Sequence, residues 1–111
     1  MSDRMRVVCA LLAIVAVAGC IGQAPAAAPQ AEDVVAACAA ACRAALDAGQ
    51  DLAAGPCLLD PIPGTDWVCD VAHSPRTDVD DVRANQCDAW WNRTATRFVE
   101  VTPDCELIQA R

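Results

Sequence analysis

The sequence predicts a small α+β domain held together by disulfides, in which an N-terminal helix packs on a short three-stranded antiparallel sheet. Three observations lead to this prediction. The chain has 111 residues and eight cysteines. An alanine-rich segment at 32–48 has the spacing of an amphipathic helix, and segments at 67–71 and 96–101 alternate like strands. Because a body of about 80 residues buries only a marginal core, disulfides are expected to supply part of its stability.

The N-terminal stretch predicts a signal peptide that ends at a lipid-modified cysteine. Two arginines precede an apolar run at 7–19, and the run closes in Val-Ala-Gly-Cys at 17–20 instead of the Ala-x-Ala pattern of ordinary signal cleavage sites. This stretch resembles the lipobox of prokaryotic lipoproteins. The resemblance implies cleavage between Gly19 and Cys20, a diacylglyceryl group on the Cys20 sulfur and a location on the extracytoplasmic face of the cell membrane.

Three segments follow from this interpretation. Residues 1–19 are the lipoprotein signal peptide, which is removed. Residues 20–31 carry the lipidated cysteine and an Ala/Pro tether that can extend over roughly 30 Å. Residues 32–111 form the disulfide-containing α+β domain. Membrane lipid is thus the expected partner of Cys20.

The charge of the mature chain excludes some classes of partner. From residue 20 onward the chain keeps six arginines and fourteen acidic residues, a net charge of −8, and it contains no lysine. Such a surface repels phosphate groups. Binding of nucleic acid and electrostatic docking on anionic lipid headgroups are therefore not expected.

The helix predicted at 32–48 has signals at both ends. Glu32 and Asp33 lie in the first turn, where the helix dipole favours anions, and Gly49 can cap the C-terminus. The apolar stripe of this helix consists of Val34 or Val35, Cys38, Cys42, Ala45 and Leu46. Its two sulfurs lie one turn apart on the same face, so they are expected to reach two different partner cysteines.

The rest of the body alternates between turns and short elements. After Gly49 we expect an irregular loop that holds Cys57, because Pro and Gly recur there. Residues 67–71 predict a strand with its odd-numbered residues on one face. A second helix is expected at about 80–91, and residues 96–101 and 105–109 predict a terminal hairpin.

Six cysteines remain in the body when the signal and the lipidation site are set aside. They are Cys38, Cys42, Cys57, Cys69, Cys87 and Cys105. An even number in a short exported chain predicts three disulfides, but six cysteines allow fifteen connectivities and the sequence does not choose between them. The pairing that we prefer joins Cys38 to Cys69, Cys42 to Cys57 and Cys87 to Cys105, because it gives each helix thiol its own partner.

Several motifs in the second half of the chain resemble those of other exported proteins. They are Gly55-Pro56-Cys57-Leu58, the stretch from Trp67 to Arg76, Asn85-Gln86-Cys87, Phe98-Val99-Glu100-Val101, Cys105 and Leu107-Ile108. On these motifs the body resembles a group of small, uncharacterised archaeal exported proteins rich in cysteine. The resemblance implies a shared fold and disulfide set. It brings no catalytic residue.

His73, the only histidine, is the centre of one catalytic hypothesis. His73 and Asp70 are candidates for the active site of a small hydrolase or lyase. The neighbouring Ser74 lacks the Gly-x-Ser-x-Gly pattern of a nucleophile elbow. We therefore favour a structural role, in which these side chains cap backbone donors at the end of a strand, and a protein that is not an enzyme.

A metal-binding protein is a second alternative. Thiols and a histidine can hold zinc or copper(I), but the close Cys-x-x-Cys pairs of most zinc sites are missing. Asp78, Asp80 and Asp81 are candidate calcium ligands, although the EF-hand spacing is absent. A solvated acidic turn is the favoured interpretation, and no cofactor is expected.

Two surface features complete the prediction. Trp90 and Trp91 point about 100° apart on a helix, so we expect one to be buried and the other to cover the sheet edge, while an exposed tryptophan would suit a protein contact. Asn92-Arg93-Thr94 fits the N-glycosylation pattern. The sequence as a whole predicts a membrane-anchored lipoprotein that binds a ligand or an envelope protein, or serves as a structural component of the envelope.

Overall fold

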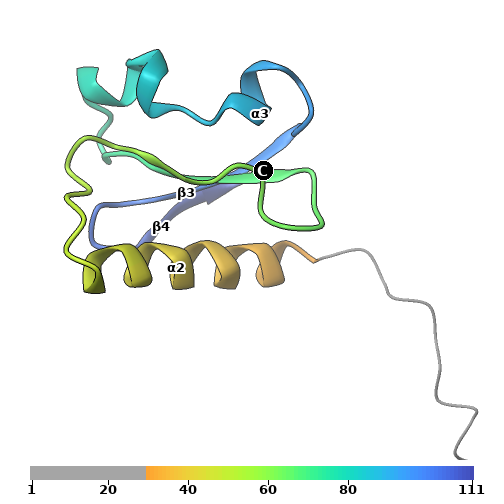
Figure 1. Cartoon of the computed structure of the whole chain (residues 1–111), viewed down its shortest axis with the longest axis horizontal. Helices are drawn as coiled ribbons and strands as arrows, with labels where there is room; N and C mark the ends of the chain where they lie inside the picture. Colours follow the sequence, from red (N-terminus) through yellow and green to blue (C-terminus); the bar gives the residue numbers. More distant parts are fainter. Residues whose placement is uncertain (1–29) are drawn as a thin grey trace, which may run out of the picture.

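A computed structural model of the chain describes residues 30–111. They form a small, disulfide-rich α+β fold with one long helix, a four-stranded mixed sheet and several short helical turns (Figure 1). The predicted signal peptide, Cys20 and most of the predicted tether lie outside the described residues. Within 30–111, no helix has the length and apolar character that crossing a membrane requires.

The long helix, α2, spans Ala31–Asp47, close to the predicted range. The Asp33 carboxylate accepts a hydrogen bond from the Gln30 N–H at 3.3 Å, which satisfies a free donor at the N-terminus. At the other end Gly49 has a φ of +80°, and its N–H donates to the Leu46 carbonyl. Gly49 therefore closes the helix as the sequence predicted.

The sheet consists of β1 (Cys57–Leu59), β2 (Trp67–Val71), β3 (Arg97–Val101) and β4 (Leu107–Ala110), in that spatial order. β1 pairs with β2 in the antiparallel direction, and β3 with β4 likewise. β2 and β3 are parallel, with Trp67 opposite Arg97 and Val71 opposite Val101. The predicted strand at 67–71 and the terminal hairpin are thus confirmed.

The prediction of three antiparallel strands was wrong in two respects. The segment at 57–59, expected to lie in a loop, forms a fourth strand at the sheet edge. The central pair is parallel because residues 72–96 cross over one face of the sheet and return the chain to the end where β2 began. Parallel neighbours require such a long connection, whereas alternation of apolar residues carries no information on strand direction.

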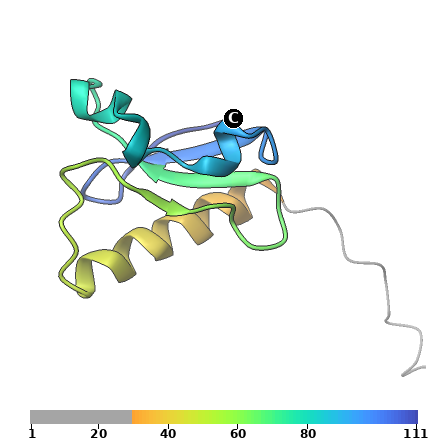
Figure 2. The ribbon, with the colours of Figure 1, turned by 45° about the horizontal axis from the view of Figure 1, so that its top comes forward.

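The crossover contains three short helical pieces in place of the continuous helix predicted at 80–91. They are η1 (Asp78–Asp81), η2 (Arg83–Asn85) and α3 (Asp88–Trp91). Val82 and Gln86 have extended backbones, which interrupt the helix twice. The crossover lies on one face of the sheet and α2 covers the other (Figures 1 and 2). We call the crossover side the outer face.

Both faces of the sheet are buried. On the α2 side, Val34, Cys38 and Cys42 pack with Trp67, Cys69, Val71, Val99 and Val101. A smaller cluster on the outer face contains Val68, Cys87, Ala89 and Ala95. Adjacent residues of β2 and β3 therefore point to opposite cores, as the alternation of a strand requires.

All six body cysteines form disulfides, which join Cys38 to Cys69, Cys42 to Cys105 and Cys57 to Cys87. The two helix thiols have different partners and the first pair is as predicted. The other two predicted pairs were wrong. Cys57 packs with the outer cluster, on the far side of the sheet from Cys42, while the turn between β3 and β4 brings Cys105 to α2. Three disulfides indicate an oxidising, extracytoplasmic environment.

Candidate functional site

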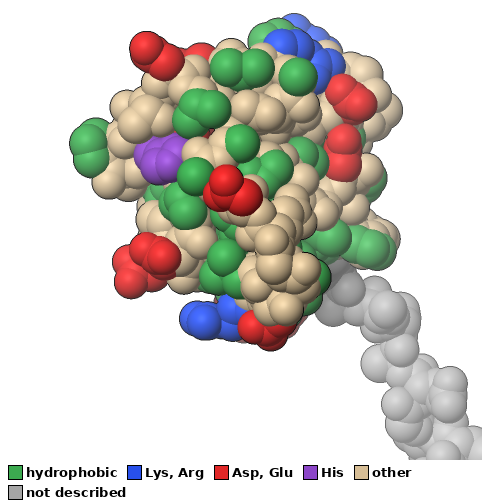
Figure 3. Space-filling view, turned by 60° about the vertical axis from the view of Figure 1, so that its left-hand side comes forward, with side chains coloured by type: hydrophobic (Ala, Val, Ile, Leu, Met, Phe, Trp, Pro, Cys, Tyr) green, Lys and Arg blue, Asp and Glu red, His purple; other side chains and the backbone are tan. Residues whose placement is uncertain are grey.

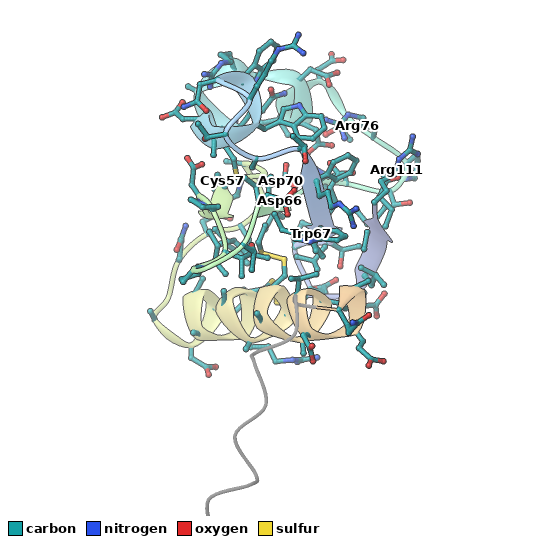
Figure 4. The ribbon with its side chains drawn as sticks, turned by 90° about the vertical axis from the view of Figure 1, so that its right-hand side faces the viewer. Cys57, Asp66, Trp67, Asp70, Arg76 and Arg111 are labelled. Atoms are coloured by element: carbon teal, nitrogen blue, oxygen red, sulfur yellow. A yellow bond between two sulfur atoms is a disulfide. The ribbon has the colours of Figure 1, made fainter. Side chains whose placement is uncertain are left out.

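The outer face of the sheet carries a cavity of about 200 Å³ beneath the crossover, which we call the outer pocket. Its lining residues are Val68 and Asp70 of β2, Phe98 and Glu100 of β3, Gln109 of β4, and Arg76, Gln86, Cys87 and Trp90 of the crossover. Asp70 lies on the crossover side of the sheet together with Arg76, while Trp67 lies toward α2 (Figure 4).

The strand register explains this composition. Asp70 is opposite Glu100, and Glu100 is opposite Gln109, so a polar row crosses three strands on the outer face. Two residues earlier Val68 is opposite Phe98, which makes an apolar row beside the polar one. The outer pocket therefore has one polar end and one apolar end.

The side chain of Glu100 is held between two donors. Its side chain is 7 % exposed, and Oε2 accepts a hydrogen bond from Nη1 of Arg76 at 3.0 Å. Oε1 accepts from Nε2 of Gln109 at 2.6 Å. Both oxygens are thus occupied, and the Arg76 guanidinium balances the charge at the mouth of the pocket.

Asp70 differs from Glu100 because it has no such partners. Its Oδ1 atom is fully buried and has no hydrogen-bond partner among the described residues. Burial raises the pKa of this carboxyl to about 7, and the negative charge of Glu100 acts in the same direction, while Arg76 partly opposes the rise. Asp70 therefore changes its protonation state near neutral pH.

His73 belongs to a separate cluster around Asp80. Burial would raise the pKa of the Asp80 carboxyl, but hydrogen bonds from the Thr77 N–H and from His73 hold it at about 2. The side chain is 1 % exposed, and Nδ1 of His73 lies 2.9 Å from its Oδ1. Asp80 also accepts from the backbone N–H groups of His73 and Thr77, at 3.0 and 2.9 Å.

This arrangement closes a turn, and both carboxylate oxygens of Asp80 take part in it. Of the two candidates for catalysis, Asp70 lines the outer pocket and His73 does not. The partner of His73 is Asp80, and its ring is partly exposed at the surface, where Figure 3 shows the single histidine in purple. The geometry is that of side chains that cap backbone donors.

The candidate calcium ligands do not converge. Asp80 is engaged as described, the Asp81 carboxylate accepts from Nε of Arg76 at 3.1 Å, and Asp78 is exposed. Within residues 30–111, one group of three potential ligand residues is close enough to share an ion: Cys57, Asp60 and Cys87. Its sulfurs are bonded to each other, and Asp60 accepts from the N–H groups of Asp88 and Ala89 at 2.8 Å.

Both adjacent tryptophans are exposed, so the expectation that one is buried was wrong. Trp90 is 41 % and Trp91 53 % exposed, because α3 is a single turn on the outer surface of the molecule. Trp90 stands edge-to-face on Phe98 at 5.1 Å between ring centroids and forms a wall of the outer pocket. Trp91 donates from Nε1 to Oε1 of Gln86 at 2.6 Å.

Trp90 also borders a second hollow of about 380 Å³, which Trp91, Arg93, Ala95 and Thr96 complete. The neighbouring Asn92 is exposed, and its Oδ1 accepts from the N–H and the hydroxyl of Thr94. Glycosylation of Asn92 stays a prediction.

Sequence reasoning missed most of the outer pocket. The pocket brings together Arg76 and Gln86 of the crossover, Glu100 of β3 and Gln109 of β4, and their convergence depends on the parallel register. One signal was available in the sequence. Asp70 and Glu100 are acidic residues with apolar neighbours on both sides within their strands, a position that requires a partner or a function.

Comparison with known proteins gives no match to this chain, whether with protein-family models, with curated proteins or with solved structures. A function is therefore inferred from the geometry of the outer pocket and from the sequence motifs.

Proposed function

We propose that this protein is a lipid-anchored, extracytoplasmic binding protein whose recognition site is the outer pocket. The carboxyl of Asp70 carries this proposal, because it lines a cavity that has aromatic walls and its buried Oδ1 atom has no hydrogen-bond partner among the described residues. An unpaired buried acceptor costs roughly 1 to 3 kcal/mol. A ligand that donates a hydrogen bond to this carboxyl would offset part of that cost, and the walls would bury its apolar part.

A panel of small cationic, neutral and anionic compounds tests the binding function. Each compound is added to the isotope-labelled full chain in a mild detergent. A compound that binds is expected to shift the NMR signals of the Asp70 and Glu100 amides and of the Trp90 indole. The indole of Trp67, which is 5 % exposed and packs on the α2 side, serves as the internal control. A panel in which no compound shifts the pocket signals contradicts the binding function.

The lipid anchor is supported by the Val-Ala-Gly-Cys motif at 17–20 and by the disulfides of the body. The acidic body has no electrostatic attraction to anionic headgroups, so a covalent lipid would be the means of attachment. The resemblance of the body to exported archaeal proteins agrees with the same location.

Fatty-acid labelling in a prokaryotic host tests the anchor. The full chain is expected to incorporate labelled lipid and to sediment with membranes, and Cys20→Ser is expected to lose both properties. Cys9→Ser is the matched control, because it removes a cysteine of the signal run and leaves the motif intact. Undiminished labelling of Cys20→Ser contradicts the anchor.

Contact with an envelope protein is a second candidate function, favoured by the exposed Trp91 beside the second hollow. Exposed aromatic side chains are frequent anchors of protein interfaces. Cross-linking in the native envelope is expected to yield an adduct that Trp91→Ala weakens and Leu107→Ala, which changes another exposed residue, does not. Equal cross-linking of the two variants contradicts this function.

A further inference from the structure

The hydrogen bonds of the outer pocket determine what kind of ligand it can accept. Each guanidinium nitrogen of Arg76 donates one hydrogen bond, to Glu100, to Asp81 and to the Asp80 carbonyl. The amide nitrogen of Gln86 donates to the Asp80 carbonyl, and that of Gln109 donates to Glu100. Asp70 Oδ1 is the buried side-chain atom of the lining that has no partner among the described residues.

This pattern favours a ligand that donates. An anionic ligand would enter beside two carboxylates, and the ion pairs of Arg76 with Glu100 and Asp81 already offset its positive charge. A cationic donor instead meets the carboxyl of Asp70, which lines the pocket next to Glu100 and whose Oδ1 atom has no hydrogen-bond partner among the described residues. The acidic surface of the mature chain also attracts cations toward the site.

The size and walls of the pocket limit the rest of the ligand. A cavity of about 150 Å³ holds benzene, so the volume of about 200 Å³ suits a molecule slightly larger than a single ring. Val68 and Phe98 supply apolar surface. Trp90 adds an aromatic wall next to Phe98, against which a ring of the ligand can pack.

We propose that the outer pocket binds a compact organic cation, with an ammonium group that donates to Asp70 and an apolar or aromatic part that packs against Trp90 and Phe98. This inference rests on the proposed binding function and names the chemical class of its ligand. Nothing in it requires a metal ion or a covalent step.

Binding of such a cation depends on pH through Asp70. The charged groups that face this carboxyl are Glu100 on β3 and both Arg76 and Asp80 on the crossover. Cys57 of β1 lies opposite Asp70, and it does not titrate because it is held in a disulfide. Asp70 loses its proton as pH rises through about 7. An alkylammonium group stays protonated in the same range, so affinity is expected to increase from pH 5.5 to pH 8.

Benzylammonium is a suitable probe, because it combines one ring with one ammonium group. We would titrate it into the full chain in mild detergent, by calorimetry and by NMR, in parallel with benzyl alcohol and benzoate as neutral and anionic analogues of the same shape. Benzylammonium is expected to bind at least tenfold more tightly than either analogue at pH 8. A charge-assisted hydrogen bond accounts for such a ratio. Binding of benzylammonium should shift the NMR signals of Asp70 and Trp90.

Asp70→Asn is expected to weaken benzylammonium binding about ten- to hundredfold at pH 8 and to abolish the increase of affinity with pH. Asp104→Asn is the matched control. It removes the same charge from an exposed turn residue that does not line the pocket, and its affinity should equal that of the unmodified chain. Trp90→Ala provides an independent variant outside the core, with a weaker affinity at every pH.

The outcomes separate this inference from the proposed function. If benzyl alcohol or benzoate shifts the pocket signals as strongly as benzylammonium, the pocket binds ligands but the cationic class is wrong. If benzylammonium binds equally well to Asp70→Asn and to the unmodified chain, the assignment of Asp70 is overturned. If none of the three probes shifts a pocket signal, the cationic class is rejected, and the wider panel decides whether the binding function survives.

Discussion

Asp70 and Glu100 lie opposite each other on two parallel strands, with both carboxyl groups on the outer face and only one of them supplied with hydrogen-bond donors. Glu100 therefore has hydrogen-bond donors at both oxygens, whereas Oδ1 of Asp70 has none among the described residues. Burial raises the pKa of the Asp70 carboxyl, and the negative charge of Glu100 acts in the same direction.

Asp70→Asn is expected to stabilise the unliganded protein at pH 8. The pKa of Asp70 rises from 3.8 to about 7 on folding, so ionisation of this group favours the unfolded chain. The cost appears as pH rises above about 4 and is complete above about 7, where it is on the order of 2 to 4 kcal/mol. Denaturant unfolding should show a gain for the variant at pH 8 that vanishes near pH 4. A gain that is the same at both pH values contradicts the prediction.

Asp80 is expected to stabilise the fold with the opposite dependence on pH. Four donors from His73 and Thr77 face its two oxygens, and an asparagine would direct an NH₂ group at some of them. Asp80→Asn should lower the free energy of unfolding by about 1 to 3 kcal/mol at pH 7.

The pKa of Asp80 falls from 3.8 to about 2 on folding, so its stabilisation is present above pH 4 and is lost as pH falls toward 2. The cost of Asp80→Asn should shrink over that interval. Asp78→Asn, which alters an exposed residue of the same turn, should change stability by less than about 0.5 kcal/mol. A comparable loss in both variants would mean that the buried contacts of Asp80 are not the cause.

Gly55 and Gly64 form a matched pair for the packing around Asp80. Both have a positive φ, at +70° and +76°, so alanine strains either backbone by about 1 kcal/mol. A Cβ at Gly55 would lie 2.8 Å from Oδ1 of Asp80, whereas one at Gly64 would have nothing within 4 Å. Thermal unfolding should show a clearly larger loss for Gly55→Ala. Equal losses would mean that backbone strain alone accounts for both.

The disulfide between Cys57 and Cys87 is expected to hold the crossover on the sheet. Replacing both cysteines by serine should cost about 2 to 4 kcal/mol of stability. Because the other two disulfides fasten α2, hydrogen exchange should increase mainly at α3 and the outer pocket, while the amides of α2 keep their protection. Uniformly faster exchange throughout the described residues would contradict a local role.

Local signals account for the part of the fold that the sequence predicted. The spacing of Val34, Cys38 and Cys42 together with Gly49 defined α2, and the alternation of Trp67, Cys69 and Val71 defined β2. In both elements the residues of a single segment are enough to show which of its faces is buried.

The missed features depend on how distant segments meet. Alternation within β3 is the same for a parallel and an antiparallel neighbour, so the pairing of Asp70 with Glu100 could not be derived from it. The disulfide partner of Cys42 depends on which side of the sheet each of the other cysteines faces. The side that each cysteine faces depends in turn on the path of the crossover. Two extended residues, Val82 and Gln86, were enough to divide the second helix, and neither is a strong helix breaker.

The three disulfides overlap along the sequence, since Cys38–Cys69, Cys42–Cys105 and Cys57–Cys87 each enclose part of another. Every peptide bond between Cys38 and Cys105 is consequently bridged by at least one of them. A protease that cuts once within this span, in the exposed turns of the crossover for example, leaves two pieces that are still covalently joined. Outside a cell, where proteases act and no chaperone repairs damage, a single cut would neither release a fragment nor detach the body from its N-terminal segment.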